Sequence, residues 1–251
     1  MQTTQNQPLV GTSAADVAKH LPGWKRAIDL FCCLLALPFL AGLTVIMTVL
    51  TKLVAPGPVF FRQERIGCGG RRFWIYKFRT MRVGADTNGH QDYFKDLIGT
   101  NAPMMKLDSR GDSRLIPGSR LLRAAGLDEL PQIINVLRRE MSIVGPRPCL
   151  AGEYAAYQPC QRQRCDAMPG LTGLWQVSGK NRTTFEEMIG FDIRYSKTKS
   201  WWLDVKIILL TVPALLVQIY DTRIRKSSAP TTARAFATVS LRSTQSASPI
   251  Q

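Results

Sequence analysis

The stretch Leu127-Asp128-Glu129-Leu130-Pro131-Gln132 decides how the rest of this sequence is interpreted. It predicts a short amphipathic helix, because Asp128 is a favoured N-cap residue and Pro131 falls in the first turn, where a missing backbone N–H costs little. Apolar residues then recur at helical spacing and predict a buried face: Leu130, Ile133, Ile134 and Leu137. The Asp128 and Glu129 carboxylates would lie at a helix N-terminus, where free N–H groups favour anions and phosphate. An isolated Asp-Glu pair is more often a plain helix start, so a functional interpretation depends on other segments.

Composition limits the class of protein. The chain has 251 residues and a formal net charge of +15. This length accommodates one ordinary core and an appendage, so we expect one domain. The positive charge indicates an anionic partner, either an acidic membrane surface or phosphorylated substrates. No zinc-finger, RNP or basic-region pattern is present, so we expect no nucleic-acid partner.

The cysteines and histidines exclude several other kinds of site. No two cysteines form a C-x-x-C pair, and we expect all six to be reduced on a cytosolic face. Two histidines are too few for a histidine-rich metal site. A Ser-His-Asp triad is formally available but no motif supports it. The six cysteines are Cys32, Cys33, Cys68, Cys149, Cys160 and Cys165.

The most apolar run is Leu30–Leu50, whose 21 residues would form a helix of ~30 Å, long enough to cross a bilayer core. A signal peptide fits poorly, because no A-x-A site follows the run. A plain spanning helix is the default, but Pro38 would kink the axis, and basic residues on both flanks place both ends on the cytoplasmic side. We therefore favour a re-entrant helix, with Asp29 paired to Arg26. The flanking residues are Lys25, Arg26, Lys52, Arg62 and Arg65.

A β-hairpin is predicted after the apolar run. Residues 59–65 and 72–78 read as strands around a glycine-rich turn at 67–70. The second strand ends in Lys77-Phe78-Arg79-Thr80-Met81. Basic residues on an edge strand are ordinarily just solvated, but beside the Asp-Glu stretch we favour Lys77 and Arg79 as phosphate ligands.

Several separate motifs, in one order, make the chain similar to the bacterial sugar transferases, the monotopic polyprenol-phosphate phosphoglycosyl transferases. The likeness extends from about Lys25 to about Val217. Two departures concern residues 115–119, which replace an I-T-R-x-G pattern, and Gly126, where a serine is common. The matching segments are K-F-R-T-M at 77–81, L-D-E-L-P-Q at 127–132, S-I-V-G-P-R-P at 142–148 and P-G-L-T-G-L-W-Q-V-S-G-K-N at 169–181.

The resemblance implies an Asp-Glu dyad, Mg²⁺, a nucleotide-sugar donor and a membrane helix broken at a proline, here Pro38. Asp128 is then the candidate nucleophile, forming an aspartyl-phosphosugar, and Glu129 the candidate metal ligand. Adjacent helical residues diverge by about 100°, so the two carboxylates should have different roles. The basic candidates for phosphate binding are Lys77, Arg79, Arg123 and Arg147. Gln176 and Asn181 are candidate nucleotide or sugar ligands, with a glycine-rich structural loop as an equal alternative.

The expected fold is α+β: a helix-rich single domain with a small β-hairpin, anchored by the N-terminal re-entrant helix and by interfacial helices. We expect a disordered N-terminus at 1–22, a membrane-embedded helix at 23–54, the catalytic domain at 55–220 and a disordered basic tail at 221–251. Within the domain, we expect a surface loop or lid at 83–112, a short helix at 119–123 and a polar helix at 152–167. The run 207–217, opened by Trp201-Trp202, is either interfacial or a core helix.

The function implied is transfer of a sugar 1-phosphate from a nucleotide sugar to polyprenol phosphate, on the cytoplasmic face of the bacterial inner membrane. The resemblance suggests a UDP donor, and the segment 178–185 is similar to members that begin exopolysaccharides with glucose or galactose. A second copy of the chain and other glycan-assembly enzymes are candidate further partners. The alternatives are a membrane-attached magnesium-dependent phosphohydrolase and a non-catalytic basic scaffold, whose binding would weaken steeply with salt.

Overall fold

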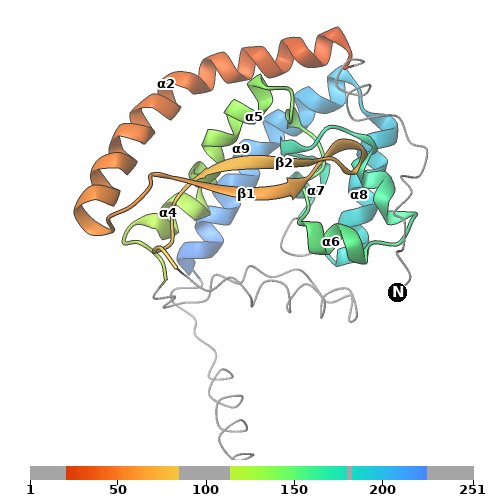
Figure 1. The fold of residues 1–251 in the computed structure, drawn as a ribbon. Coiled ribbons are helices and arrows are strands. Elements are labelled where there is room, and N and C mark those ends of the chain that lie inside the picture. The colour runs from red at the N-terminus through yellow and green to blue at the C-terminus, as the bar shows by residue number, and fades with distance from the viewer. Residues whose placement is uncertain (1–20, 85–113, 180–182, 225–251) are drawn as a thin grey trace, which may run out of the picture.

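A computed structural model describes residues 21–84, 114–179 and 183–224, with side chains described up to residue 220. The fold is α+β and helix-rich. Two long helices and several short ones surround an antiparallel hairpin and a small parallel sheet (Figure 1). The predicted N-terminus, the predicted lid and most of the predicted tail lie outside the described residues.

Helix α2 spans Gly23–Val54, the range predicted for the membrane helix. It is continuous through Pro38, where a break was predicted, and its ribbon is bowed across the domain (Figure 1). Its 32 residues would extend ~48 Å if straight. Three threonines donate their hydroxyl groups to carbonyls four residues earlier, so their polar groups are satisfied within the apolar helix: Thr44, Thr48 and Thr51.

Both ends of α2 are attached to the same globular body. Near its start, the Lys25 ammonium donates to the Asp204 carboxylate at 2.6 Å and to the Tyr195 hydroxyl at 2.9 Å. At its end, the Arg79 guanidinium donates to the carbonyls of Ala55 and Pro56. The buried residues of α2 include Cys33, Leu40 and Met47, so one face packs on the domain along most of the helix.

Asp29 does not form the predicted ion pair with Arg26. Its Oδ1 accepts hydrogen bonds from the Ser142 hydroxyl and the Ile143 amide, each at 2.8 Å. Arg26 instead donates to the carbonyl oxygens of Val136 and Leu137. The prediction was wrong because spacing along one helix did not reveal that strand β3 (Ser142–Val144) and helix α5 (Ile133–Leu137) offer partners to the two residues.

The predicted hairpin is confirmed. Strand β1 (Phe60–Ile66) pairs antiparallel with β2 (Arg72–Phe78), and Arg65 lies opposite Phe73 in the register. Side chains alternate between the two faces of a strand. One face of the hairpin packs on α2 and α5 through Phe73 and Ile75, which share a buried cluster with Cys33 and Ile133.

The Asp-Glu stretch forms a tighter helix than predicted. Residues Leu127–Gln132 are the 3₁₀-helix η2, followed by the α-helix α5 (Ile133–Leu137). Gly126, not Asp128, is the N-cap; its φ of 69° lets the chain turn before Asp128, and no side chain caps the helix. The tighter turn also shifts the buried face. Asn135 and Val136 are fully buried, whereas Leu137, predicted to be buried, is exposed.

A parallel two-stranded sheet holds the Gly-Pro-Arg-Pro segment. Strand β3 (Ser142–Val144) pairs with β4 (Gly170–Thr172), and the Gly145 amide donates to the Thr172 carbonyl at 2.8 Å. The two segments approach so closely that a Cβ on Gly145 would lie 2.1 Å from the Met168 carbonyl oxygen. A Cβ on Gly170 would lie 2.1 Å from the Gly145 nitrogen. Glycine is therefore required at both positions.

The polar helix predicted at 152–167 is broken. It consists of α6 (Ala151–Ala156) and the 3₁₀-helix η3 (Gln161–Asp166), with an extended residue at Tyr157. Pro159 explains the break, because a proline lacks the N–H and disfavours helical geometry in the residue before it. The short helix predicted at 119–123 is confirmed as α4 (Ser119–Ala124).

Three further helices complete the domain. These are α7 (Leu174–Val177), α8 (Phe185–Thr198) and α9 (Trp201–Ile224). Thr184 caps α8 by accepting a hydrogen bond from the Glu187 amide, and the Glu187 carboxylate accepts from the Thr184 amide. Helix α9 runs past residue 221, where the tail was predicted to begin.

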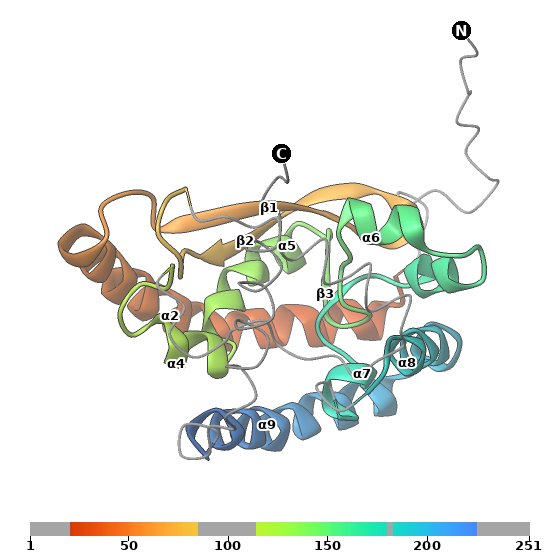
Figure 2. The same cartoon turned by 90° about the horizontal axis from the view of Figure 1, so that it is seen from below.

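Helices α2 and α9 are both long and apolar enough to cross a membrane, judged on length and composition alone. The Lys25–Asp204 ion pair joins their first turns, and from there the two helices diverge (Figure 1). In Figure 2 the hairpin lies along one side of the molecule and α9 along the other, with α5 and β3 between them. Helix α9 is longer than the eleven-residue apolar run indicated, and it exposes large apolar side chains. These are Trp201, Trp202, Leu209, Leu210, Val212, Leu216, Val217 and Tyr220.

None of the six cysteines forms a disulfide; all six are described, and all are unpaired. Cys149 and Cys165 are buried in a cluster with Trp175 and Phe185, where they act as small apolar side chains. The fold is therefore stabilised by packing and hydrogen bonds rather than by cross-links.

Candidate active site

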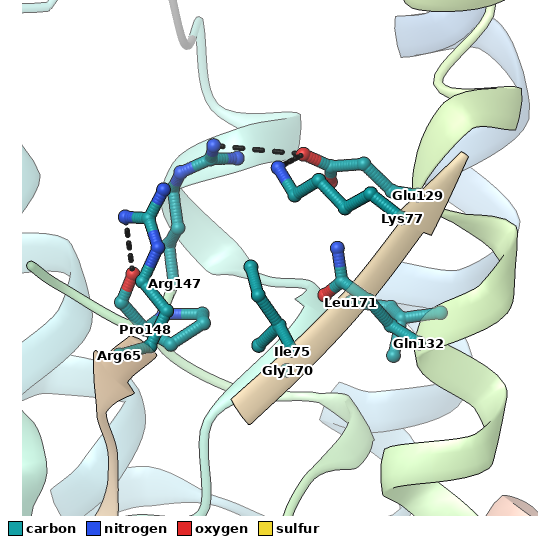
Figure 3. A pocket seen from close by; sticks show the side chains of 9 residues that line it. All are labelled: Arg65, Ile75, Lys77, Glu129, Gln132, Arg147, Pro148, Gly170 and Leu171. Carbon is teal, nitrogen blue, oxygen red and sulfur yellow. Dashed lines mark hydrogen bonds and ion pairs between the residues drawn. The ribbon is translucent and has the colours of Figure 1, made fainter. Parts of the chain in front are cut away.

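The predicted dyad lies beside a pocket at the junction of the hairpin, η2 and the small sheet. Each element contributes side chains, and Figure 3 shows them converging from both sides. The pocket is lined by Arg65, Ile75, Lys77, Glu129, Gln132, Arg147, Pro148, Gly170 and Leu171. Segments separated by about a hundred residues in the sequence therefore meet at one place.

Glu129 lies between two cations in this pocket. Its Oε1 accepts from the Lys77 ammonium at 2.8 Å and lies 3.5 Å from a guanidinium nitrogen of Arg147 (Figure 3). Asp128, the preceding residue, is buried, with 8% of its surface exposed. The structure thus brings three predicted residues into contact, Glu129, Lys77 and Arg147, while Asp128 precedes Glu129 in η2 and does not line the pocket.

Asn135 holds the strand that carries Lys77 against the helix that carries the dyad. Its Oδ1 accepts from the Tyr76 amide at 3.3 Å, and its Nδ2 donates to the Trp74 carbonyl at 2.7 Å. Nδ2 also donates to the Glu140 carboxylate at 2.6 Å. Because Asn135 is fully buried, these hydrogen bonds fix β2 relative to α5.

Arg164 supports the backbone of Arg147 from behind. One of its guanidinium nitrogens donates to the Arg147 carbonyl at 3.0 Å and to the Asp192 carboxylate. The other donates to the Tyr157 hydroxyl at 2.6 Å. The buried Arg164–Asp192 pair therefore fixes the turn from which the Arg147 side chain reaches Glu129.

The charge balance of the pocket favours anions. Three basic side chains, Arg65, Lys77 and Arg147, line it with the single carboxylate of Glu129. Burial lowers the pKa of Lys77, and the Arg147 and Arg65 charges lower it further, whereas Glu129 and Asp128 raise it. Positive charge in excess of negative charge, in a partly buried site, attracts phosphate groups.

The side chains almost close the pocket. The cavity between them is about 10 Å³, which is space for about one water molecule. A nucleotide sugar is far larger, so side chains of the lining must move for one of its phosphates to enter. The Glu129 carboxylate lies beside Lys77 and Arg147, where a phosphate oxygen would bind.

Two predicted phosphate ligands lie elsewhere. The buried Arg79 guanidinium donates to the Ala55 and Pro56 carbonyls at the end of α2, where the last carbonyls of a helix lack intrahelical partners. Arg123 donates to the Thr80 hydroxyl at 3.2 Å and does not line the pocket. The structure therefore gives Arg79 a structural role as a cap of the membrane helix.

The predicted nucleotide ligands are only partly described. The Gln176 side chain donates to the Leu171 carbonyl at 3.1 Å, beside the pocket lining, and its Oε1 is buried without a hydrogen-bond partner. Trp175 is buried and donates to the Thr183 hydroxyl at 2.7 Å, so it is a core residue rather than a stacking platform. Asn181 lies outside the described residues.

The sequence analysis missed Arg65 and Gln132 as pocket residues. Arg65 was interpreted only as a basic flank of the membrane helix. Strand alternation could have identified it, because Arg65 pairs with Phe73, and residues 73, 75 and 77 share one face of β2. Gln132 could not have been found this way, because its direction depends on the 3₁₀ turn.

The side chains at the pocket can bind Mg²⁺ only if the substrate supplies further metal ligands. The described residues contain no group of three or more metal-binding side chains. Magnesium in phosphoryl-transfer sites commonly binds one or two carboxylates together with substrate phosphates and water. Glu129 lines the pocket in which a phosphate would bind, so its carboxylate fits this coordination scheme.

These features define an α+β protein with two long apolar helices and a carboxylate pair beside a basic pocket. The chain belongs to the bacterial sugar transferase family, whose model matches residues 20–218.

Three curated relatives illustrate the match. The UDP-glucose:undecaprenyl-phosphate glucose-1-phosphate transferase of Caulobacter vibrioides is 41% identical over 200 residues, covering 76% of this chain and 69% of the relative. The galactosyl transferase CpsE of Streptococcus agalactiae is 40% identical over 197 residues, covering 77% of this chain and 42% of the relative. The exopolysaccharide production protein ExoY of Sinorhizobium fredii is 36% identical over 192 residues, covering 76% of this chain and 84% of the relative. The chain thus spans less than half of the length of CpsE and most of the length of ExoY.

Proposed function

We propose that this chain transfers a sugar 1-phosphate from a nucleotide sugar, most simply a UDP-sugar, to polyprenol phosphate, and so begins a polysaccharide. The observation that supports this most is the contact of Glu129, the neighbour of Asp128, with Lys77 and Arg147. Relatives named as transferases of glucose 1-phosphate or galactose phosphate to undecaprenyl phosphate support the same reaction.

The proposed chemistry has two balanced steps. In the first, an Asp128 carboxylate oxygen attacks the sugar-bearing phosphorus of the donor, forming a P–O bond to the enzyme. The bond from this phosphorus to the bridging oxygen breaks, and the nucleoside monophosphate leaves with the electron pair. In the second, an oxygen of polyprenol phosphate attacks the same phosphorus, and the Asp128 carboxylate leaves. The product is a lipid diphosphate sugar.

The other side chains stabilise charge in this scheme. Lys77 and Arg147 exchange the Glu129 carboxylate for phosphate oxygens, and Arg147 can donate two parallel hydrogen bonds. Glu129 would hold Mg²⁺, which when bound neutralises charge on the phosphate oxygens. Asp128 and Glu129 are thus assigned different roles.

The apolar helices would bring this site to its lipid substrate. We place α2 as a re-entrant helix and α9 in the interface, with the domain on the cytoplasmic face of the bacterial inner membrane. Support comes from the attachment of both ends of α2 to one body, through Lys25 and Arg79. A helix that crossed the bilayer would carry its two ends to opposite sides.

One purified preparation, incubated with different donors in the presence and absence of lipid, tests this function. The full chain in nanodiscs is incubated with radiolabelled UDP-glucose, UDP-galactose or an N-acetylated UDP-sugar, with and without polyprenol phosphate. We expect lipid-extractable label with glucose or galactose, only when the lipid phosphate is present. Water-soluble sugar phosphate formed without lipid would indicate a phosphohydrolase, and binding without turnover would indicate a scaffold. Reaction of the N-acetylated sugar alone would contradict the proposed donor.

The topology can be tested at Pro38. A single cysteine placed near residue 5, on a background lacking the native cysteines, should be shielded from a membrane-impermeant reagent in intact spheroplasts. In Pro38→Ala, we expect part of the population to be labelled. A proline inside a straight helix costs ~3 kcal/mol and so favours a bend, and the alanine variant no longer has this cost. Labelling of the parent protein from outside would show that α2 spans the membrane.

A further inference from the structure

Arg65 is a buried cation whose hydrogen-bonding capacity is not used up by the protein. It lies near the end of β1, with 7% of its surface exposed, and lines the pocket beside Arg147 (Figure 3). One terminal nitrogen donates to the Pro148 carbonyl at 3.3 Å, and the other donates to the Gln63 side-chain oxygen at 2.7 Å. Its Nε is buried and has no hydrogen-bond partner.

The charge of Arg65 also lacks a direct counter-ion. It forms no ion pair with any described carboxylate; Glu129 is instead paired with Lys77 and Arg147. Burial lowers the pKa of Arg65 and so does the neighbouring Arg147 charge, while Glu153 and Glu129 raise it only from a distance. A buried guanidinium beside a second guanidinium is unfavourable unless an anion binds to both.

A purely structural role does not require this charge. The contacts of Arg65 with Pro148 and Gln63 are hydrogen bonds to neutral oxygens, so neither contact needs a positive charge on the donor. Beyond these two contacts, the guanidinium supplies positive charge and a spare N–H at the wall of the pocket. The position is therefore suited to an anionic ligand that the free protein does not contain.

We infer that Arg65 and Arg147 form a second anion subsite, which binds the phosphate adjacent to the one attacked by Asp128. Lys77 and Glu129 line the other side of the pocket (Figure 3), where the proposed function puts the phosphorus that reacts. The assignment of this subsite to the departing nucleoside monophosphate rests on the proposed function. Existence of the subsite does not, because any diphosphate would occupy both positions.

Binding of inorganic pyrophosphate tests the subsite without catalysis. The full chain in nanodiscs is titrated calorimetrically at fixed ionic strength, with EDTA to remove metal bound by pyrophosphate. We expect Arg65→Gln to weaken binding about tenfold or more, the size expected for a lost charge-assisted hydrogen bond. Arg72→Gln is the matched control, because Arg72 is an exposed arginine of the same hairpin, paired with Glu64, and should bind within twofold of the parent.

The variant Arg65→Lys separates the effect of the positive charge from the effect of the hydrogen bonds to Pro148 and Gln63. Lysine keeps the charge but cannot contact both Pro148 and Gln63 as the guanidinium does, so the inference expects most of the pyrophosphate affinity to return. The inference is overturned if Arg65→Lys binds no better than Arg65→Gln, or if Arg65→Gln binds within twofold of the parent. If the parent binds pyrophosphate in this pattern but transfers no sugar, the subsite stands and the proposed function fails.

Discussion

Asp128→Asn is expected to reduce transferase activity to background, a loss of roughly 10⁴-fold or more, the size found when a covalent nucleophile is removed. Asparagine keeps the size of the side chain but cannot form an acyl phosphate. Because Gly126 rather than Asp128 caps η2, the substitution removes no helix cap. We therefore expect the variant to fold, with a melting temperature close to that of the parent.

Glu129→Gln is the comparison that separates the roles of the two carboxylates. It removes a metal ligand and the counter-ion of Lys77 and Arg147 but leaves the nucleophile in place. We expect its activity to vanish at low magnesium and to return in part at high magnesium. Activity of Asp128→Asn above background, or rescue of that variant by magnesium, would remove Asp128 from the nucleophilic role.

Gly145→Ala is expected to be the most damaging substitution for folding. The added Cβ would lie 2.1 Å from the Met168 carbonyl oxygen and 2.9 Å from the Gly170 nitrogen, and both are backbone atoms that cannot rotate away. The clash would separate β3 from β4 and should destabilise the protein by about 4–5 kcal/mol or more, the range of exceptional single substitutions.

Gly152→Ala is the matched control for that experiment. A Cβ at Gly152, in α6, would have no atom within 4 Å apart from its chain neighbours and its own helix backbone, and alanine favours a helix. Denaturant unfolding of both variants in the same micelles should show a large loss for Gly145→Ala and none for Gly152→Ala. Equal stability of the two variants would contradict the close approach of the two strands.

Sequence patterns correctly predicted the helices and strands that are determined by nearby residues. The hairpin was found because glycines separate two strand-like runs, and α2 because a long apolar run has a single structural solution. The prediction of one helix at 152–167 was wrong because Pro159 interrupts it. The position of the cap at Asp128 was wrong because the left-handed Gly126 begins the turn earlier.

The sequence predicted only those site residues that lie in the motif segments. Asp128, Glu129, Lys77 and Arg147 were identified from motif segments, and the structure brings Glu129, Lys77 and Arg147 into contact. Arg79 belongs to the same motif as Lys77 but lies past the end of β2, where its guanidinium reaches the end of α2. Motif membership could not separate these two residues, because the difference depends on where β2 ends relative to the end of α2.

The most direct test of the central claim is a search for sugar phosphate on the enzyme itself. The purified chain is mixed with sugar-labelled donor in the absence of polyprenol phosphate, quenched rapidly and analysed by mass spectrometry of its peptides. The account predicts label on Asp128, release of the nucleoside monophosphate before lipid is added, and parallel lines in a two-substrate kinetic analysis. Intersecting lines, with no label at residue 128, would show direct transfer between the substrates and contradict the account.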